Sequence, residues 1–190
     1  RALRGVLRVI NLTIDRRPVS VEPGTTILEA ARQNGIHIPT LCYLKDINQI
    51  GACRMCLVEV EGARGLQTAC TTPCAEGMVV HTNTPRVRET RKLILELLLS
   101  DHNIECPTCV RADNCELARL SHELGVGQIT LQGARHESHY DDYSGAITVD
   151  TSKCVLCQRC VATCREVQGV SAIAVTRRGF RSEIRPFFGV

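Results

Sequence analysis

The stretch that decides the fold is Cys154-Val155-Leu156-Cys157-Gln158-Arg159-Cys160-Val161-Ala162-Thr163-Cys164. Its cysteines follow the spacing C-x2-C-x2-C-x3-C, which lets several thiolates converge on one iron–sulfur centre. A redox-active thiol pair needs only one C-x-x-C, so it leaves half of this run unexplained. The run therefore predicts an iron–sulfur site.

The same spacing is that of bacterial ferredoxins, except that Arg165 stands where proline is usual. In that arrangement three cysteines bind one [4Fe–4S] cluster and the fourth binds the other cluster of a pair. A second run is absent from this sequence, so a cluster on Cys154, Cys157 and Cys160 needs a fourth ligand from outside it. Cys164 then binds the second, paired [4Fe–4S] cluster. In the alternative, which we favour less, Cys164 completes one site.

The 12 cysteines among 190 residues are the outlying feature of the composition. Disulfide partners need separation and suitable geometry, whereas most of these cysteines come as closely spaced pairs and runs. Residues 1–5 start no signal peptide, and no apolar run approaches the ~18 residues of a membrane span. The formal charge of +3 is too small to indicate nucleic-acid binding. We expect a cytoplasmic protein without a membrane span and without a nucleic-acid partner.

A second ligand set lies upstream, with the spacing C-x10-C-x2-C-x13-C, and consists of Cys42, Cys53, Cys56 and Cys70. Its order is that of plant-type [2Fe–2S] ferredoxins, although their first gap is x4. Small residues before Cys53 allow backbone N–H groups to approach the sulfides of a [2Fe–2S] cluster. A zinc ribbon pairing Cys53 and Cys56 with Cys70 and Cys74 is the alternative, but it leaves Cys42 unexplained. We predict that Cys74 is a buried cysteine and not a ligand.

A third set lies between these two and has the spacing H-x3-C-x2-C-x5-C: His102, Cys106, Cys109 and Cys115. One histidine and three cysteines fit either a [4Fe–4S] cluster or a structural zinc ion. The position between two other cluster motifs favours the [4Fe–4S] cluster. The remaining histidines have no ligand spacing of their own: His37, His81, His122, His136 and His139.

The class is predicted to be α+β, beginning with a β-grasp [2Fe–2S] domain over residues 1–82. Alternating hydrophobicity predicts strands at residues 6–15 and 19–22 around a turn at 16–18, and later strands at 57–61, 66–69 and 78–82. Thr26 and Glu29 form a capping box at the start of a helix that runs to about Asn34, before Gly35. Two strands, a helix and further strands are typical of the β-grasp fold.

Residues 83–128 are predicted to form a small helical domain around the one-His, three-Cys set. Thr84 and Pro85 begin a helix that ends near residues 101–102. Its apolar face is expected to consist of Val87, Leu93, Ile94, Leu97 and Leu98. A second helix is expected from about Cys115 to Leu124, stopped by Gly125.

The rest of the chain is predicted to be a linker, residues 129–146, followed by a ferredoxin-like [4Fe–4S] unit, residues 147–190. The unit is expected to begin with a short strand at Ile147 and to include a helix from about Cys160 to Gln168. Because it has only one cysteine run, we expect it to be truncated here.

These motifs together resemble a known family, the N-terminal iron–sulfur region of the large subunits of NAD(P)-linked, including electron-bifurcating, [FeFe] hydrogenases. The large iron–sulfur subunit of respiratory NADH dehydrogenase and the N-terminal region of NAD-dependent formate dehydrogenases are similar. The matching stretches are Pro39-Thr40-Leu41-Cys42, residues 51–62, residues 95–102, Cys106-Pro107-Thr108-Cys109, Asn114-Cys115-Glu116-Leu117, residues 153–157 and Arg178-Gly179-Phe180. The sequence around Cys106 and Cys115 is closer to that of the hydrogenases than to that of the dehydrogenases.

The resemblance implies an electron-transfer module with one [2Fe–2S] cluster, one [4Fe–4S] cluster on one His and three Cys, and one or two further [4Fe–4S] clusters. It implies a flavin- and NAD(P)-binding iron–sulfur subunit and a catalytic subunit or domain as partners, with ferredoxin as a further candidate. No dinucleotide, P-loop or hydrolytic motif is present, so no catalytic site is expected within these residues. The alternatives are the same module of a formate dehydrogenase or another NAD(P)-linked complex, and a zinc-binding structural protein.

Overall fold

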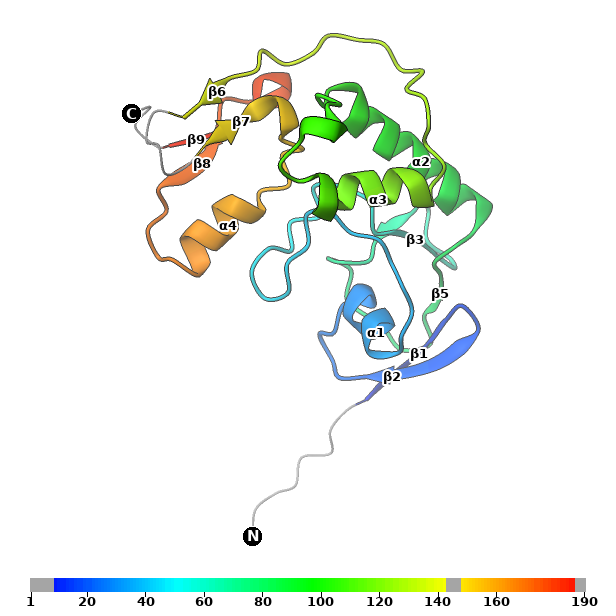
Figure 1. Cartoon of the computed structure of the whole chain (residues 1–190). Helices are drawn as coiled ribbons and strands as arrows, with labels where there is room; N and C mark the ends of the chain where they lie inside the picture. Colours follow the sequence, from blue (N-terminus) through cyan, green and yellow to red (C-terminus); the bar gives the residue numbers. More distant parts are fainter. Residues whose placement is uncertain (1–8, 143–147, 187–190) are drawn as a thin grey trace. The chain divides into compact units, whose positions relative to one another are not determined.

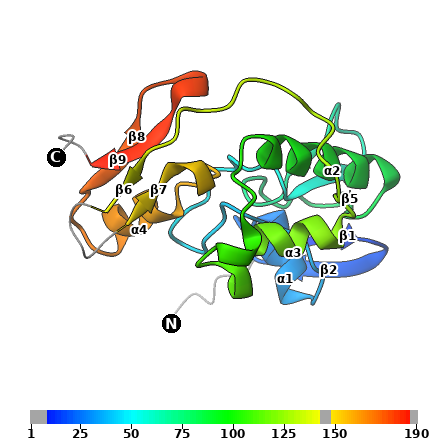
Figure 2. The same ribbon diagram turned by 45° about the horizontal axis from the view of Figure 1, so that its top comes forward.

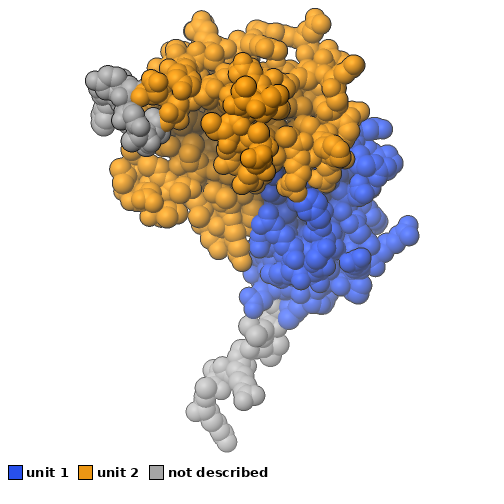
Figure 3. Space-filling model, in the orientation of Figure 1, with its two compact units in different colours: residues 1–40, 54–91 blue, residues 41–53, 92–190 orange. Residues whose placement is uncertain are grey.

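A computed structural model describes residues 9–142 and 148–186 of the chain. The chain divides into two compact units, one of residues 1–40 and 54–91 and one of residues 41–53 and 92–190 (Figure 3). Residues 41–53, which the prediction places in the first domain, are grouped with the second unit, where Asn48 and the Tyr43 carbonyl are hydrogen-bonded to Cys157 and Arg159. Part of the strand predicted from residue 6, residues 6–8, lies outside the described residues, as does Ile147.

The first unit is a mixed sheet covered by one short helix. Its strands, in the order β2-β1-β5-β3-β4, are β1 (Ile10–Ile14), β2 (Arg17–Val21), β3 (Leu57–Val60), β4 (Gln67–Thr68) and β5 (Val79–His81). Strands β1 and β5 are parallel, and the other neighbours are antiparallel. Helix α1 (Ile27–Gln33) lies beside β1 and β2 (Figure 1). Ile14, Leu28 and Val58 are completely buried and form part of the apolar core.

The first turn, predicted at residues 16–18, lies instead at residues 15 and 16. Asp15 and Arg16 both have positive φ, 46° and 66°, which is the backbone of a two-residue hairpin turn that matches the twist of its strands. Arg17 and Pro18 therefore belong to β2. A proline is tolerated there because β2 is an edge strand of the sheet.

The predicted cap of the first helix is confirmed. The Thr26 hydroxyl oxygen accepts a hydrogen bond of 3.3 Å from the Glu29 backbone N–H, and Gly35 follows the helix with φ 68°. Replacing Thr26 by alanine should lower the free energy of unfolding by about 1 kcal/mol, because one backbone donor loses its partner. Denaturant unfolding measures this change. An unchanged midpoint would show that the cap contributes nothing, and Thr25→Ala, one residue before the N-cap, is the control.

Helix α2 (Pro85–Ser100) begins as predicted, and Val87 of its predicted apolar face is buried, but the rest of that face is wrong at Leu93 and Leu97. The Thr84 hydroxyl accepts a hydrogen bond from the Val87 N–H. Leu93 and Leu97, expected on the buried face, are half exposed. The buried positions follow a spacing of four instead: Val87, Arg91, Leu95 and Leu99. Arg91 is tolerated in this row because its guanidinium donates a 2.7 Å hydrogen bond to the Leu57 carbonyl.

The second unit consists of short elements joined by loops (Figure 2). Helix α3 (Glu116–Glu123) ends as predicted at Leu124, and Gly125 has φ 64°. Its other elements are the 3-10 turns Cys106–Thr108, Ala112–Asn114, Thr151–Lys153 and Gly179–Arg181, helix α4 (Arg159–Glu166), and the strand pairs β6 (Tyr140–Asp141) with β7 (Val149–Asp150) and β8 (Ile173–Thr176) with β9 (Glu183–Pro186). The pair of β8 and β9 was not anticipated from the sequence.

The predicted linker is anchored where it is described. The Glu96 carboxylate accepts hydrogen bonds from the backbone N–H groups of Thr130 and Leu131, at 2.5 and 3.2 Å. A hydrogen bond from the Thr130 hydroxyl at 2.6 Å, followed by the one from the Thr130 backbone N–H, lowers the pKa of Glu96. Further along, strand β6 pairs with β7. The segment predicted to be only a linker therefore contributes a strand to the second unit.

A search of the described residues finds no helix with the length and hydropathy needed to cross a membrane.

Candidate iron–sulfur cluster sites

The predicted [2Fe–2S] ligands occur as two close pairs, one in each unit. In the second unit, the Cys42 N–H donates a 3.4 Å hydrogen bond to the Cys53 sulfur. A hydrogen bond between the side chains of Cys42 and Cys53, followed by burial, raises the pKa of the Cys42 thiol. In the first unit, Cys56 and Cys70 lie at the same end of the paired strands β3 and β4, and both are fully buried. The Cys56 carbonyl accepts a hydrogen bond from the Ala69 N–H at 3.0 Å.

The loop between these cysteines has a backbone suited to an anionic cluster. Gly51 and Arg54 both lie in the left-handed region, with φ 62° and 56°. A non-glycine residue there costs free energy, and such residues gather at functional sites. Left-handed residues turn successive N–H groups toward one side, which creates a concave binding surface for sulfides or other anions.

The one-His, three-Cys set lies between helices α2 and α3 along the chain. The buried Nδ1 of His102 has no hydrogen-bond partner among the described residues. Burial, followed by the charge of Lys153, lowers the pKa of His102 and so favours the neutral imidazole that binds metals. Cys106 and Cys109 bracket a 3-10 turn, and the Cys109 N–H bonds the Cys106 carbonyl at 3.3 Å. Cys115 is the N-cap of α3, and its sulfur accepts a 3.4 Å hydrogen bond from the backbone of that helix.

The four-cysteine run has the same features as the first loop. The sulfur of Cys154 accepts a hydrogen bond from the Leu156 N–H at 3.4 Å, and the sulfur of Cys164 accepts one from the Ala172 N–H at 3.2 Å. Leu156 and Gln158, which flank Cys157, have φ 51° and 59°. Burial raises the pKa of the Cys154 and Cys160 thiols, a cost that bonding to iron would offset.

The sulfur donors of these sites and the N–H groups that bond to them fit iron–sulfur clusters. Within residues 9–142 and 148–186, no three His, Cys, Asp or Glu side chains gather closely enough to hold one metal ion. A [2Fe–2S] cluster takes two protein ligands on each iron and a [4Fe–4S] cluster takes one on each, so the four ligands need not meet at one point. The cysteines form no disulfide in the described part of the chain, and Cys74 is buried as predicted, with its pKa raised by burial. The N–H to sulfur hydrogen bonds and the left-handed loops suit anionic sulfur.

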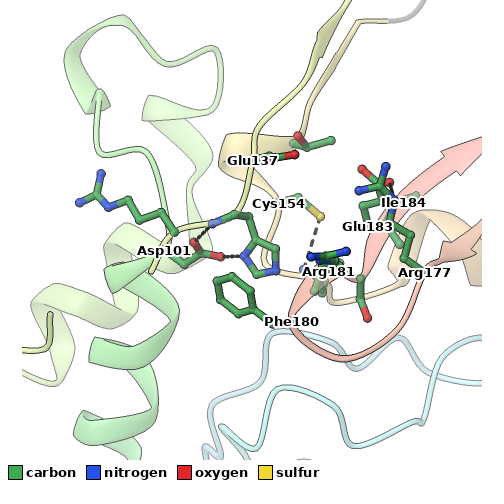
Figure 4. A pocket seen from close by; sticks show the side chains of 13 residues that line it. Asp101, Glu137, Cys154, Arg177, Phe180, Arg181, Glu183 and Ile184 are labelled. Carbon is green, nitrogen blue, oxygen red and sulfur yellow. Dashed lines mark hydrogen bonds and ion pairs between the residues drawn. The ribbon is translucent and has the colours of Figure 1, made fainter. Parts of the chain in front are cut away.

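A cavity of about 420 Å³ lies beside Cys154 (Figure 4). The Asp101 carboxylate accepts a 2.8 Å hydrogen bond from the His136 backbone and also pairs with the His136 ring. That ring stacks on Phe180 with their centroids 4.2 Å apart. His136, to which the sequence assigns no ligand role, therefore supports the residue that precedes His102.

Two residues that contact the ligand-bearing segments were not predicted from the sequence. The side chains of Asn48 and Arg159 bond to the segments that carry the predicted ligands. A cation inside a cysteine run was an available signal for Arg159. Asn48 had none, because its partners are distant in sequence.

Three family models match successive parts of the chain. Residues 8–85 match a 2Fe-2S iron-sulfur cluster binding domain. Residues 91–130 match the NADH-ubiquinone oxidoreductase-G iron-sulfur binding region, and residues 144–189 match the ferredoxin-like domain of NADH-quinone oxidoreductase subunit 3. Fold and site thus define a mixed α/β protein with a [2Fe–2S] ferredoxin-like domain and [4Fe–4S] domains.

Similar whole proteins specify the family further. An NADH-quinone oxidoreductase subunit of Rhizobium meliloti is 42% identical over 95% of this chain and 22% of its own length. The gamma subunit of the NAD-reducing hydrogenase HoxS of Cupriavidus necator is 34% identical over 92% of this chain and 74% of its own. A crystal structure of NAD+-reducing [NiFe]-hydrogenase in the H2-reduced state has a chain that matches with a TM-score of 0.87, at 28% identity over 94% of this chain and 75% of that chain.

The chain belongs to the family of iron–sulfur subunits of NAD(P)-linked hydrogenases and NADH-quinone oxidoreductases. The predicted resemblance is confirmed at this level. The chain spans only about a fifth of the length of the Rhizobium meliloti relative. That the chain is part of an [FeFe] hydrogenase, as the sequence around Cys106 and Cys115 favours, stays a prediction.

Proposed function

We propose that this chain is an electron-transfer module that carries electrons, one at a time, between a flavin- and NAD(P)-binding iron–sulfur subunit and a catalytic site elsewhere in a complex. The observation that carries the proposal is the recurrence of N–H to sulfur hydrogen bonds in all three predicted ligand sets. Such bonds stabilise the negative charge of cluster sulfur and tune its reduction potential. The family supports the same role, because its members belong to NAD(P)-linked redox complexes.

The ligands follow from the three sets. In this proposal a β-grasp domain holds a [2Fe–2S] cluster on Cys42, Cys53, Cys56 and Cys70. A helical domain holds a [4Fe–4S] cluster on His102, Cys106, Cys109 and Cys115. A ferredoxin-like unit holds one or two further [4Fe–4S] clusters on Cys154, Cys157, Cys160 and Cys164, with a ligand from outside this sequence. The clusters supply reversible one-electron chemistry, while the chain binds them, donates N–H hydrogen bonds and limits their contact with water.

The partners and setting are proposed on the same basis. A hydrogenase is the favoured complex, and a formate dehydrogenase or another NAD(P)-linked complex is the alternative. The catalytic subunit or domain and the flavin subunit are inferred from the family, and ferredoxin is a further candidate. A reducing compartment, the cytoplasm, suits a chain whose cysteines come in cluster-ligand spacings and form no disulfide among the described residues.

The deciding experiment is anaerobic purification, followed by assays of iron, acid-labile sulfide and zinc and by EPR after reduction. Roughly 10 iron atoms per chain would match one [2Fe–2S] and two [4Fe–4S] clusters, and roughly 6 would match the first two sites alone. Either result supports an iron–sulfur module. Zinc without sulfide would overturn it in favour of a structural zinc protein.

Replacing His102 by cysteine should keep a [4Fe–4S] cluster but lower its midpoint potential. A thiolate adds a negative charge that a neutral imidazole lacks, and this charge disfavours the reduced cluster. An EPR-monitored redox titration measures the change. The control is His122→Cys, which adds a cysteine at an exposed position of α3 and should leave every potential unchanged. An unchanged potential in His102→Cys would mean that His102 is not a ligand.

A further inference from the structure

Arg159 joins two segments that lie far from it in sequence. It is the first residue of α4 and precedes Cys160. Its Nη1 donates a 2.7 Å hydrogen bond to the Glu116 carboxylate, and its Nη2 donates a 3.3 Å hydrogen bond to the Tyr43 carbonyl. Glu116 directly follows Cys115, and Tyr43 directly follows a ligand of the first set. One guanidinium thus connects a segment from each ligand set, all within the second unit.

Asn48 makes a second connection between two of the same segments. Its side-chain amide donates hydrogen bonds to the Cys42 carbonyl at 2.8 Å and to the Cys157 carbonyl at 3.0 Å. Asn48 is 3% exposed, so both donors of this amide are satisfied in a buried place. A buried polar group left without its partners is costly, so these bonds favour one arrangement of the two loops.

We propose that Arg159 and Asn48, with Glu116 and the carbonyls of Cys42, Tyr43 and Cys157, form a polar junction that sets the spacing of the three ligand-bearing segments. The positive charge of Arg159 also raises the reduction potential of the clusters bound next to it. The inference rests on the proposed function, since it concerns the clusters assigned there. Arg159 and Asn48 act as positioning residues in it and bind no iron.

The chemistry of arginine suits this role. Its planar guanidinium presents several donors in fixed directions, so it can bond a carboxylate and a carbonyl at once. The side chain of Arg159 is 25% exposed and that of Glu116 is 39% exposed, so water screens the pair less than it screens a surface pair. The buried Nε–H of Arg159 has no acceptor among the described residues. This N–H of the cation therefore remains able to donate a hydrogen bond to an anionic sulfur.

The clusters held by these segments would supply one-electron transfer, which needs no covalent bond to form or break and no proton to move, and the junction would act on it through the spacing of the segments. The rate of such a transfer falls steeply with the distance between the two groups. A device that fixes the spacing of the segments therefore fixes the rate, and a fixed positive charge beside the clusters favours their reduced states.

The test uses Arg159→Gln, Arg159→Lys and Glu116→Gln in the anaerobically prepared whole protein. For each, the iron and sulfide content, the midpoint potentials and the magnetic interaction between reduced clusters are measured by EPR. Arg159→Gln should retain its clusters, shift the potentials of the His102 and Cys154 sets downward, and weaken the interaction between clusters. Arg159→Lys should restore the potentials but not the interaction, because an ammonium does not hold both partners in the same geometry.

Glu116→Gln tests the direction in which the reduction potentials shift. It leaves Arg159 in place but removes the facing negative charge, so the same potentials should shift upward. The matched control is Arg165→Gln, which removes an exposed arginine of the same helix that pairs only with the neighbouring Glu166 among the described residues. Equal shifts in Arg159→Gln and Arg165→Gln, or no shift in either Arg159→Gln or Glu116→Gln, would overturn the junction. Wild-type protein without iron and sulfide would instead overturn the proposed function, so the two failures are distinguishable.

Discussion

Replacing Cys53 by serine should remove the [2Fe–2S] EPR signal and about 2 iron atoms per chain while the [4Fe–4S] signals remain. Cys53 is a predicted ligand, is 7% exposed, and accepts the N–H of Cys42 on its sulfur. A serine hydroxyl is a much poorer ligand for iron than a thiolate, and its shorter bond would pull the loop inward. The [4Fe–4S] signals should persist because their ligands lie in other segments.

The matched control is Cys74→Ser. Cys74 is 5% exposed, so it is buried like Cys53 and undergoes the same change of sulfur to oxygen. Burying a hydroxyl without a partner costs about 1–3 kcal/mol, so Cys74→Ser should lower stability and keep every cluster. A Cys53→Ser protein with an undiminished [2Fe–2S] signal would remove Cys53 from the ligand set. Loss of that signal in Cys74→Ser would make Cys74 a ligand of the [2Fe–2S] cluster and would overturn its assignment as a buried cysteine without a ligand role.

Removing iron and sulfide should unfold residues 148–186 while the sheet of the first unit stays folded. Among the described residues of this segment, only Ala162 and Ile184 are apolar and buried. Burial of a large aliphatic side chain contributes about 1.5–3 kcal/mol, whereas ordering each residue costs about 1–2 kcal/mol. One isoleucine and the much smaller alanine do not offset that cost over the segment. Bonds to the clusters must therefore supply much of its stability.

Amide hydrogen exchange followed by mass spectrometry measures this difference. After iron removal under reducing conditions, the amides of β8 and β9 should exchange fast, while those of β1 should stay protected. The first unit is its own control, because Leu12, Ile14, Val58 and Val80 supply an apolar core that does not depend on metal. Unchanged protection of β8 and β9 in protein shown to lack iron would mean that the segment folds without clusters.

Features that depend on neighbouring residues were predictable. The caps of α1 and α2 at Thr26 and Thr84, and the glycine after α3, are confirmed because each involves groups within a few residues of one another. The strands of the first unit were predicted to within a few residues. The exception was the first turn, where two non-glycine residues, Asp15 and Arg16, take positive φ and no glycine signals it.

The buried face of α2 was not predictable from hydrophobicity. Leu93 and Leu97 are apolar but half exposed, whereas the charged Arg91 is 5% exposed. A leucine-rich helix offers several apolar stripes, and its neighbours select one of them. The Leu57 carbonyl makes burial of Arg91 favourable, and that acceptor lies 34 residues away in the sequence.

The sequence by itself determined which residues are candidates for binding iron, because ligands of one cluster come largely from short spacings such as C-x2-C. It also determined the family, through the order of the three motifs. Only the tertiary structure decided how the motifs are tied together, since Arg159 meets Tyr43 across 116 positions and Asn48 meets Cys157 across 109. Local spacing limits which atoms a short loop can bring together. Contacts between distant loops depend on the folding of the whole unit, and no spacing encodes them.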